Sequence, residues 1–439
     1  MSNLISLPHL HISKICLLEG MPPHLGRLAN LQSLPYFVVG KGSDQSGIRE
    51  IGSLLHLRWT LCLSRLENVK DGEDASGANL IGKERLDSLE LKWSYLSGLR
   101  EMELGVLGML QPPKILKELT IKCYAGLKFS LWIGDPLFSN MVRVSLYNCS
   151  NYHLLPPVGQ LPCLKELYIT GMFAVEVVGP EFYGEGSFPF RVLEILKCSD
   201  MKHWEKWLPF DQDMSSGVFP SLKFLSIQMC PKLGGELPKK LNSLTTLEIV
   251  RCEELVVAIA NYEQVRELKI YGCKALVHST TVVDLKLLET LCLSNILELR
   301  LQAGGFTKGL GKIKELTILS CEQLTASLKN EDRCFPHLIS QLSKGLLQLS
   351  SLQELHIRHC SHLVSFPDVG LPPSLTVLKI TECDSLMYIS KYQIPRNLKR
   401  IHISWCRSSK SLVEEEKELV GSSSSSFSLS TWRYLFVHL

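Results

Sequence analysis

The sequence lacks the short motifs with which most enzymes bind nucleotides or metal ions. It contains no Gly-x-x-x-x-Gly-Lys-Ser/Thr phosphate loop and no Gly-x-Gly-x-x-Gly after a predicted strand. His-Glu-x-x-His and Cys-x-x-Cys pairs are also missing. The sequence therefore predicts a chain that is not an enzyme, with no catalytic residue, no metal site and no cofactor.

The sequence also has no marked excess of one charge and no long apolar runs. The 47 Lys and Arg residues nearly balance 44 Asp and Glu residues, whereas a nucleic-acid-binding protein usually concentrates basic residues on one face. No stretch approaches the roughly 18 apolar residues of a membrane-spanning helix. The segment from Met1 to His9 has neither the basic region nor the apolar run of a secretory signal. We therefore expect no nucleic-acid partner and no membrane insertion.

Cysteine is plentiful, but its use does not indicate a disulfide framework. The 15 cysteines are an odd number, spread through a long chain in which we find no secretory signal. Reduced thiols are the usual state in the cytosol and nucleus. We therefore predict a cytoplasmic protein, with the nucleus as the alternative compartment.

Leucine accounts for 79 of the 439 residues, and its spacing reveals an internal repeat. The pattern apolar-x-x-apolar-x-apolar-x-x-Cys is clearest from Leu352 to Cys360. Its copies begin at Met141, Leu164, Leu193, Leu222, Leu244, Val265, Leu288, Ile313, Leu352, Leu375 and Leu398. Eight copies end in cysteine, namely Cys149, Cys230, Cys252, Cys273, Cys321, Cys360, Cys383 and Cys406.

This is the leucine-rich-repeat pattern, and its spacing has a physical explanation. The central apolar-x-apolar alternation is that of a short strand with two inward side chains, and the cysteine follows where the chain leaves the strand. One unit buries about five apolar side chains, worth roughly 10 kcal/mol. Ordering about 23 backbone residues costs more than this, so the units must stack. We predict an α/β-type repeat fold, a leucine-rich-repeat solenoid (horseshoe) with a parallel concave β-sheet and irregular convex loops and short helices.

The regularity of the repeat divides the chain into three parts. We predict less regular repeats over residues 1–135, an array that starts within a repeat and lacks a cap. Regular repeats follow over 136–409, with a longer insertion at about 325–350. Residues 410–439 form an acidic and serine-rich tail that we expect to be flexible.

Several segments resemble plant coiled-coil nucleotide-binding leucine-rich-repeat disease-resistance proteins. Residues 21–40, Met-Pro-Pro-His-Leu-Gly-Arg-Leu-Ala-Asn-Leu-Gln-Ser-Leu-Pro-Tyr-Phe-Val-Val-Gly, closely resemble a signature of that class. Further similar stretches are residues 47–52, 66–70, 83–94, 155–162, 178–184 and 201–207. The likeness extends from residue 1 to about 409 and concerns the repeat region only. The family's coiled coil and NB-ARC nucleotide switch have no counterpart in this sequence, so ATP or ADP binding is assigned to none of its residues.

The resemblance implies a protein-recognition module, the sensor part of an intracellular immune receptor. Its partner would be a pathogen effector, a guarded host protein or an NB-ARC switch domain, with which it would make autoinhibitory contacts. The alternatives are a truncated gene remnant with little independent function and a leucine-rich-repeat adaptor protein. An extracellular receptor domain would call for a signal sequence, several glycosylation sequons and a regular 24-residue period, which we do not find.

The repeat also predicts which side chains face a partner. The residue between the two strand leucines forms an outward column of Ser145, Tyr168, Lys197, Ser226, Glu248, Lys269, Cys292, Thr317, His356, Lys379 and His402. Among these, Cys292 should react early with alkylating reagents, whereas the inward Cys252, Cys273, Cys360 and Cys383 should be protected.

The last three units combine Arg358, Lys379, Lys399 and Arg400 with only two acidic residues, Glu354 and Glu382. Protonation of His356, His359 and His402 at mildly acidic pH would add positive charge. A metal site at His356, His359, Cys360 and His362 is disfavoured, because the repeat itself imposes that spacing. We expect partner contacts at Tyr147, Tyr168, Tyr271, His356, Arg358, His359, Lys379, His402 and Trp405.

Overall fold

The computed structural model describes two compact units, Met1–Ser243 and Leu244–Leu439, which we treat separately. The described residues are 6–12, 18–41, 46–95, 103–186, 188–210, 217–238, 240–258, 262–277, 285, 287–300, 310–320, 349–360, 363, 371–387, 389, 395–408 and 434–438. No helix within these ranges is both long and apolar enough to cross a bilayer.

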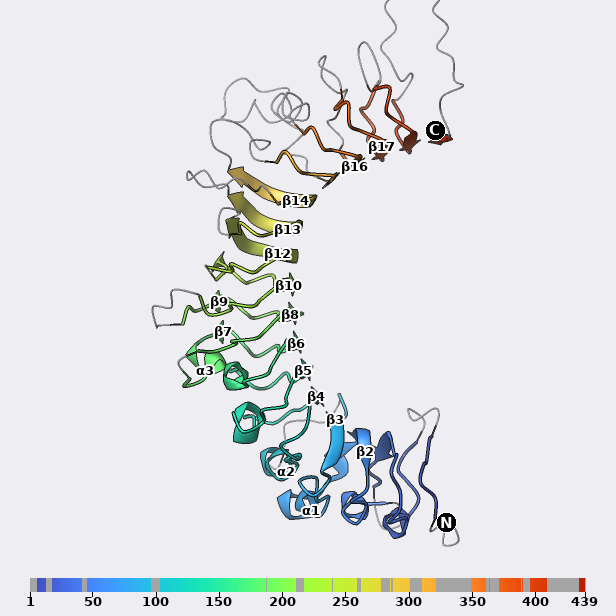
Figure 1. Ribbon diagram of the computed structural model, residues 1–439, viewed down its shortest axis with the longest axis vertical. Helices are drawn as coiled ribbons and strands as arrows, with labels where there is room; N and C mark the ends of the chain where they lie inside the picture. Colours follow the sequence, from blue (N-terminus) through green and yellow to red (C-terminus); the bar gives the residue numbers. More distant parts are fainter. Residues whose placement is uncertain are drawn as a thin grey trace, which may run out of the picture. The chain divides into compact units, whose positions relative to one another are not determined.

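The first unit is built on a ladder of parallel strands, one from each repeat (Figure 1). Each strand pairs with the next in the series β1 (Tyr36–Val38), β2 (Arg58–Ser64), β3 (Arg85–Lys92), β4 (Glu118–Lys122), β5 (Arg143–Tyr147), β6 (Glu166–Thr170), β8 (Ile195–Ser199) and β10 (Phe224–Gln228). Because parallel neighbours need a crossover, every connection returns along the side of the repeat away from the sheet.

Short helices and a small second sheet occupy those connections in the first unit. The α-helices are α1 (Gly72–Ser76), α2 (Glu103–Met109) and α3 (Pro180–Tyr183). The 3₁₀ helices are η2 (Leu25–Arg27), η3 (Ile48–Ile51), η4 (Leu66–Asn68), η5 (Leu131–Gly134) and η6 (Val158–Gln160). Strands β7 (Val177–Val178) and β9 (Lys206–Trp207) pair in parallel, and β11 (Gly235–Glu236) lies beside β9. The predicted irregular side of loops and short helices is thus confirmed in this unit.

The second unit continues the same design. Its parallel series is β12 (Thr246–Ala258), β13 (Glu267–Val277), β14 (Thr290–Arg300), β15 (Glu315–Leu319), β16 (Glu354–Arg358), β17 (Val377–Thr381), β18 (Arg400–Ser404) and β19 (Tyr434–His438). The predicted leucine-rich-repeat solenoid with a parallel sheet is therefore confirmed. The predicted insertion at about 325–350 and most of the tail 410–439 lie outside the described residues; within the tail, β19 pairs with β18.

The register of the strands confirms the predicted outward column within each unit. Ser145, Tyr168, Lys197 and Ser226 lie opposite one another in the first unit. In the second unit the series is Glu248, Lys269, Cys292, Thr317, His356, Lys379 and His402. A slip of one residue would turn every strand leucine toward solvent, so the buried leucines fix this register.

Inward side chains form a continuous apolar core in each unit. The paired strand residues, such as Leu167 and Ile169 of β6, are fully buried. So are the predicted cysteines Cys149, Cys230, Cys252, Cys273, Cys360, Cys383 and Cys406, whereas Cys321 lies outside the described residues. The inward direction of the described cysteine ladder is confirmed.

The residue directly after the five-residue core of most strands has left-handed backbone torsion angles, whereas Val39 after β1 and Trp93 after β3 do not. In the first unit the left-handed residues are Arg65, Cys123, Asn148, Gly171, Asp200 and Met229, with φ from 51° to 69°. In the second unit they are Arg251, Gly272, Asn295, Ser320, His359, Glu382 and Trp405, with φ from 46° to 73°. Only Gly, Asn and Asp adopt this conformation easily, so the fold imposes it on the other residue types.

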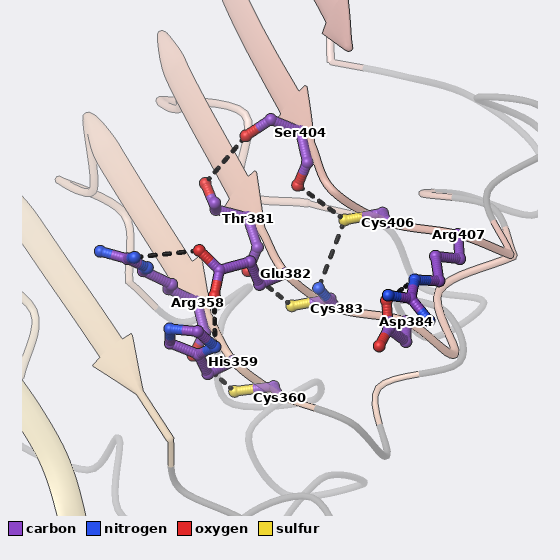
Figure 2. Close-up of polar contacts among 10 residues, drawn as sticks. All are labelled: Arg358, His359, Cys360, Thr381, Glu382, Cys383, Asp384, Ser404, Cys406 and Arg407. Carbon is purple, nitrogen blue, oxygen red and sulfur yellow. Dashed lines mark hydrogen bonds and ion pairs between the residues drawn. The ribbon is translucent and has the colours of Figure 1, made fainter. Parts of the chain in front are cut away.

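Hydrogen bonds to the neighbouring repeat explain why this conformation persists. The N–H of His359 donates to the carbonyl of Thr381 (3.0 Å), and the N–H of Glu382 donates to the carbonyl of Ser404 (2.9 Å). The same two carbonyls also accept the thiols of Cys383 and Cys406, each at 3.5 Å (Figure 2). The left-handed turn thus points one N–H at the next repeat and aims the following cysteine inward.

Three residues of the outward column are buried, namely Ser145, Ser226 and Cys292. Cys292 is only 6% exposed, because Tyr271 and Thr317 of the adjacent strands lie close to its thiol. Burial is also the main reason why the pKa of this thiol is raised. The prediction that Cys292 reacts early is therefore wrong: an outward direction does not guarantee exposure where larger side chains flank a small one.

A buried lysine joins two repeats of the first unit. The side chain of Lys83 is fully buried, and its ammonium donates to the carbonyls of Ile51 (2.7 Å) and Leu54 (3.3 Å). These carbonyls lie at and just beyond the end of η3, and each also accepts a backbone N–H, from Leu54 (3.1 Å) and Leu57 (3.4 Å) respectively. Burial lowers the pKa of Lys83 to about 8.

We predict that alkylation by iodoacetamide separates the thiols by exposure. The exposed Cys163 should react in the folded chain, whereas Cys149, Cys252, Cys360 and Cys383 should react only after denaturation. Burial raises the pKa of Cys149 to about 12, and the hydrogen bond with the Cys360 thiol, followed by burial, raises the pKa of Cys383 to about 12, so few thiolates are present at neutral pH. Mass spectrometry of native and denatured samples measures this; equal labelling in the folded chain would contradict the register.

The left-handed position predicts opposite effects of two substitutions. Met229→Asn should raise the free energy of unfolding by about 1 kcal/mol, because Asn tolerates the φ of 51° that strains Met. Gly171→Ala should lower it by about 1–3 kcal/mol, because its Cβ would lie 2.1 Å from Asn148 Oδ1. Chemical denaturation measures both, with the exposed Met387→Asn as the control expected to change little.

The lowered pKa of Lys83 predicts that the free energy of unfolding rises with pH. The pKa is 10.5 in an ordinary lysine and about 8 in the folded chain, so between these values the folded state binds fewer protons. The wild-type chain should therefore gain stability relative to Lys83→Met as pH rises from 8 to 10.5, by about 3 kcal/mol in total. Urea unfolding of both chains across this range tests it, and a constant difference would show that Lys83 stays charged.

Candidate functional site

The outward face of the parallel sheet collects the residues that the sequence predicted as partner contacts. In the second unit, His356, Lys379 and His402 lie side by side on β16, β17 and β18. Arg358 ends β16, and His359 and Trp405 occupy left-handed positions at the edge of the same face. We call these six residues the C-terminal patch.

Two further predicted contacts, Tyr147 and Tyr168, belong to the first unit, and Tyr271 lies on β13 of the second. The predicted set is therefore divided among three places. Only the C-terminal patch is a contiguous group.

Ion pairs reduce the free positive charge of the C-terminal patch. Glu382 lies 2.9 Å from Arg358 Nη2 and 2.6 Å from His359 Nδ1, so one carboxylate faces both basic side chains (Figure 2). Lys379 and Arg400 form no ion pair with a carboxylate in the described part of the chain. The patch is still basic, but Arg358 contributes less than the residue count suggested.

His356 is less available for protonation than the sequence suggested. Its ring is half-buried and Nε2 lies 3.4 Å from Glu354 without making a hydrogen bond. Burial, and then the nearby charge of Lys379, lower the pKa of His356. Its charge therefore develops at a lower pH than that of an ordinary histidine.

Trp405 supplies the apolar part of the patch. Its side chain is 69% exposed although tryptophan is large and apolar, and its backbone has a φ of 58°. This conformation is the one that the fold imposes after the strands of both units, so the exposure of the ring, and not its backbone, marks Trp405 as a contact. Trp and Arg are also enriched among the residues that dominate binding energies.

Tyr271 is held by its neighbours and is not a free aromatic contact. It is half-buried beside Cys292, and burial is the main reason why the pKa of its hydroxyl is raised. Glu248 and Glu315 add to this shift through their negative charge. Tyr271 therefore lies in an acidic part of the face of the second unit.

The face of the first unit carries a network of ion pairs that the sequence did not predict. Arg143 lies 2.9 Å from Glu118 and 2.8 Å from Glu166, on the strands either side of it. Glu166 also accepts a 2.9 Å hydrogen bond from the Tyr168 hydroxyl. The pKa of Glu166 is lowered, chiefly by its hydrogen bond to Arg143.

A cluster of Lys197 with two aromatic rings was also missed. The ammonium of Lys197 lies 4.8 Å from the ring centre of Phe224 and 5.8 Å from that of Tyr168. The sequence did contain one sign of this cluster. Phe224 and Ile195 occupy the strand position that holds charged residues in β4, β5 and β6.

The geometry gives no support for a metal site. Among the described residues no group of three or more His, Cys, Asp or Glu side chains is placed to hold a metal ion. Cys360 is buried whereas His359 is exposed, so the two side chains point apart. His362 lies outside the described residues.

Parts of the chain are similar in sequence to a family of leucine-rich repeats and to known plant proteins. The family model described as R13L1/DRL21 LRRs matches residues 48–172. Disease resistance RPP13-like protein 1 of Arabidopsis thaliana is 38% identical over 227 residues, which are 48% of this chain and 21% of that protein. Disease resistance protein RGA2 of Solanum bulbocastanum is 31% identical over 229 residues, 51% of this chain and 23% of that protein. The chain thus spans about a quarter or less of the length of these relatives.

A leucine-rich-repeat protein of Leptospira interrogans aligns with 94% of this chain and 92% of its own, with 15% identity and a TM-score of 0.48. At this TM-score and identity, only the sequence matches carry a conclusion. Residues 48–172 thus match leucine-rich repeats of the R13L1/DRL21 type, and about half of the chain is similar in sequence to plant disease-resistance proteins.

Proposed function

We propose that this chain is a protein-recognition module, comparable to the leucine-rich-repeat sensor region of a plant intracellular immune receptor. The observation that carries the proposal is the aligned outward face of the parallel sheets. The similarity to plant disease-resistance proteins over about half of the chain supports a role in defence. Its place of action would be the cytoplasm or the nucleus.

The construction of the sheet suits recognition. Strand backbones are held by hydrogen bonds to both neighbours, and the core side chains all lie on the other face. Outward residues can therefore vary without disturbing packing, while their positions stay rigid. Rigid elements hold binding residues with less loss of conformational entropy than loops do.

We further propose that the C-terminal patch contacts the partner. It combines an exposed tryptophan with Lys379 and, beside the patch, Arg400, two cations that form no ion pair with a described residue, so it fits a partner surface that is acidic and has an apolar projection. The partner would be a pathogen effector, a guarded host protein or an NB-ARC switch domain. No enzymatic step is part of this proposal.

A partner captured from plant extract by the wild-type chain should be lost when the patch is altered. Trp405→Ala combined with Lys379→Ala should weaken its binding by about 2 kcal/mol or more, because each removes an exposed contact and no core atom. The free energy of unfolding should change by only about 0.5 kcal/mol per substitution. Calorimetric titration and thermal unfolding measure the two quantities.

The matched control is Met387→Ala combined with Arg266→Ala. It also removes one exposed apolar side chain and one cation of the second unit, from outside the C-terminal patch. It should keep the affinity of the wild-type chain. Full affinity in the patch variant, or equal losses in both variants, would contradict the assignment of the patch.

A further inference from the structure

On the face of strands β4 to β10 in the first unit, Lys197 is not part of the ion-pair network that the described residues form. Lys117, Lys122, Arg143, Lys165 and Lys223 each lie within 4.0 Å of a carboxylate, with Asp87, Glu90, Glu118, Glu166 and Glu194 as partners. Lys197, in the middle of this face on β8, forms no such pair with a described residue.

Aromatic and aliphatic side chains surround this lysine. Phe224 of β10 and Tyr168 of β6 lie on either side of it, with their ring centres 4.8 and 5.8 Å from Nζ. Ile195 occupies the first position of β8, in register with Phe224. The three residues are half-buried, so part of each side chain is open to solvent, and Lys197 is exposed.

The rim of this group is polar and electrically balanced. Glu118 and Glu166 share Arg143, and Glu194 lies between Lys165 and Lys223, so three cations face three carboxylates. Ser199 of β8 completes the boundary, whereas Ser226 of β10 is buried. An apolar and aromatic centre with a polar rim is the arrangement of protein-binding surfaces.

Charge decides which partner fits. The rim adds little net charge, so the field at the centre of the group comes from the ammonium of Lys197. An acidic side chain arriving there would gain a partner that no carboxylate among the described residues already occupies, in surroundings of reduced water access. A basic side chain would be repelled by the ammonium of Lys197.

We propose that Lys197, Phe224, Tyr168 and Ile195 form a binding site for a polypeptide segment in which an Asp or Glu stands next to an apolar side chain. The carboxylate pairs with Lys197 and the apolar side chain packs on Phe224 and Ile195. This inference rests on the proposed recognition function and gives the first unit a contact of its own, separate from the C-terminal patch.

The test uses a phage-displayed library of random 12-residue peptides, selected on the full wild-type chain. Selected peptides should share an Asp or Glu beside Leu, Ile, Phe or Trp. Synthetic copies should lose about 10-fold in affinity for Lys197→Met and for Phe224→Ala. Replacing the acidic residue by its amide should weaken binding to the wild-type chain and leave binding to Lys197→Met unchanged.

Lys117→Met is the matched control, since it removes an exposed lysine of the first unit that is paired with Asp87 and lies outside the rim; it should change the affinity by less than about 2-fold. Melting temperatures establish that the variants fold. The inference is overturned if the selection yields no common motif or if the peptides bind Lys197→Met as they bind the wild-type chain. Either result would leave the test at the C-terminal patch unaffected, so the two proposals fail separately.

Discussion

The structure depends on a hydrogen bond between successive repeats at the point where most strand cores end. There the backbone turns into the left-handed region and donates one N–H to the last strand carbonyl of the next repeat, as His359 does to Thr381. The cysteine that follows in many repeats donates its thiol to the last carbonyl of its own strand core, as Cys383 does to Thr381, whereas the Cys273 thiol donates to Ala275. This one turn links the repeats, ends the strand and directs a small side chain into the core.

Because the buried leucines fix the register and the turn links the repeats, the two sides of the sheet have separate tasks. Inward residues are constrained to Leu, Ile, Val and Cys, and they supply the stability that no single repeat could have. Outward residues are free to differ from strand to strand, and here they form two different surfaces. The face of β4 to β10 is balanced by ion pairs around Lys197, whereas the C-terminal patch is basic and carries the exposed Trp405.

Much of the fold could be predicted from the sequence because the repeat encodes it directly. The spacing of leucine and cysteine gave the parallel sheet, the inward thiols and the outward column, since strand alternation is a strictly local property. Three features depend on neighbouring repeats and were not predictable in this way. Cys292 is covered by residues of two other strands, Arg358 is neutralised by Glu382 of the next repeat, and Lys197 lies between rings from β6 and β10. The left-handed turn escaped prediction because Met229, His359 and Trp405 are residue types that do not favour it.

Residue-resolved amide hydrogen exchange of the free chain tests the central constraint most directly. The amides of Asn148, Asp200, His359 and Glu382 each donate to a carbonyl of the next repeat, so they should exchange as slowly as those of the adjoining strands. The amides of the exposed turns at Lys202 and Lys232 should exchange far faster. If the four left-handed amides exchange at the rate of those turns, the hydrogen bonds between repeats are absent. That result would contradict the account of how the outward face is held in place.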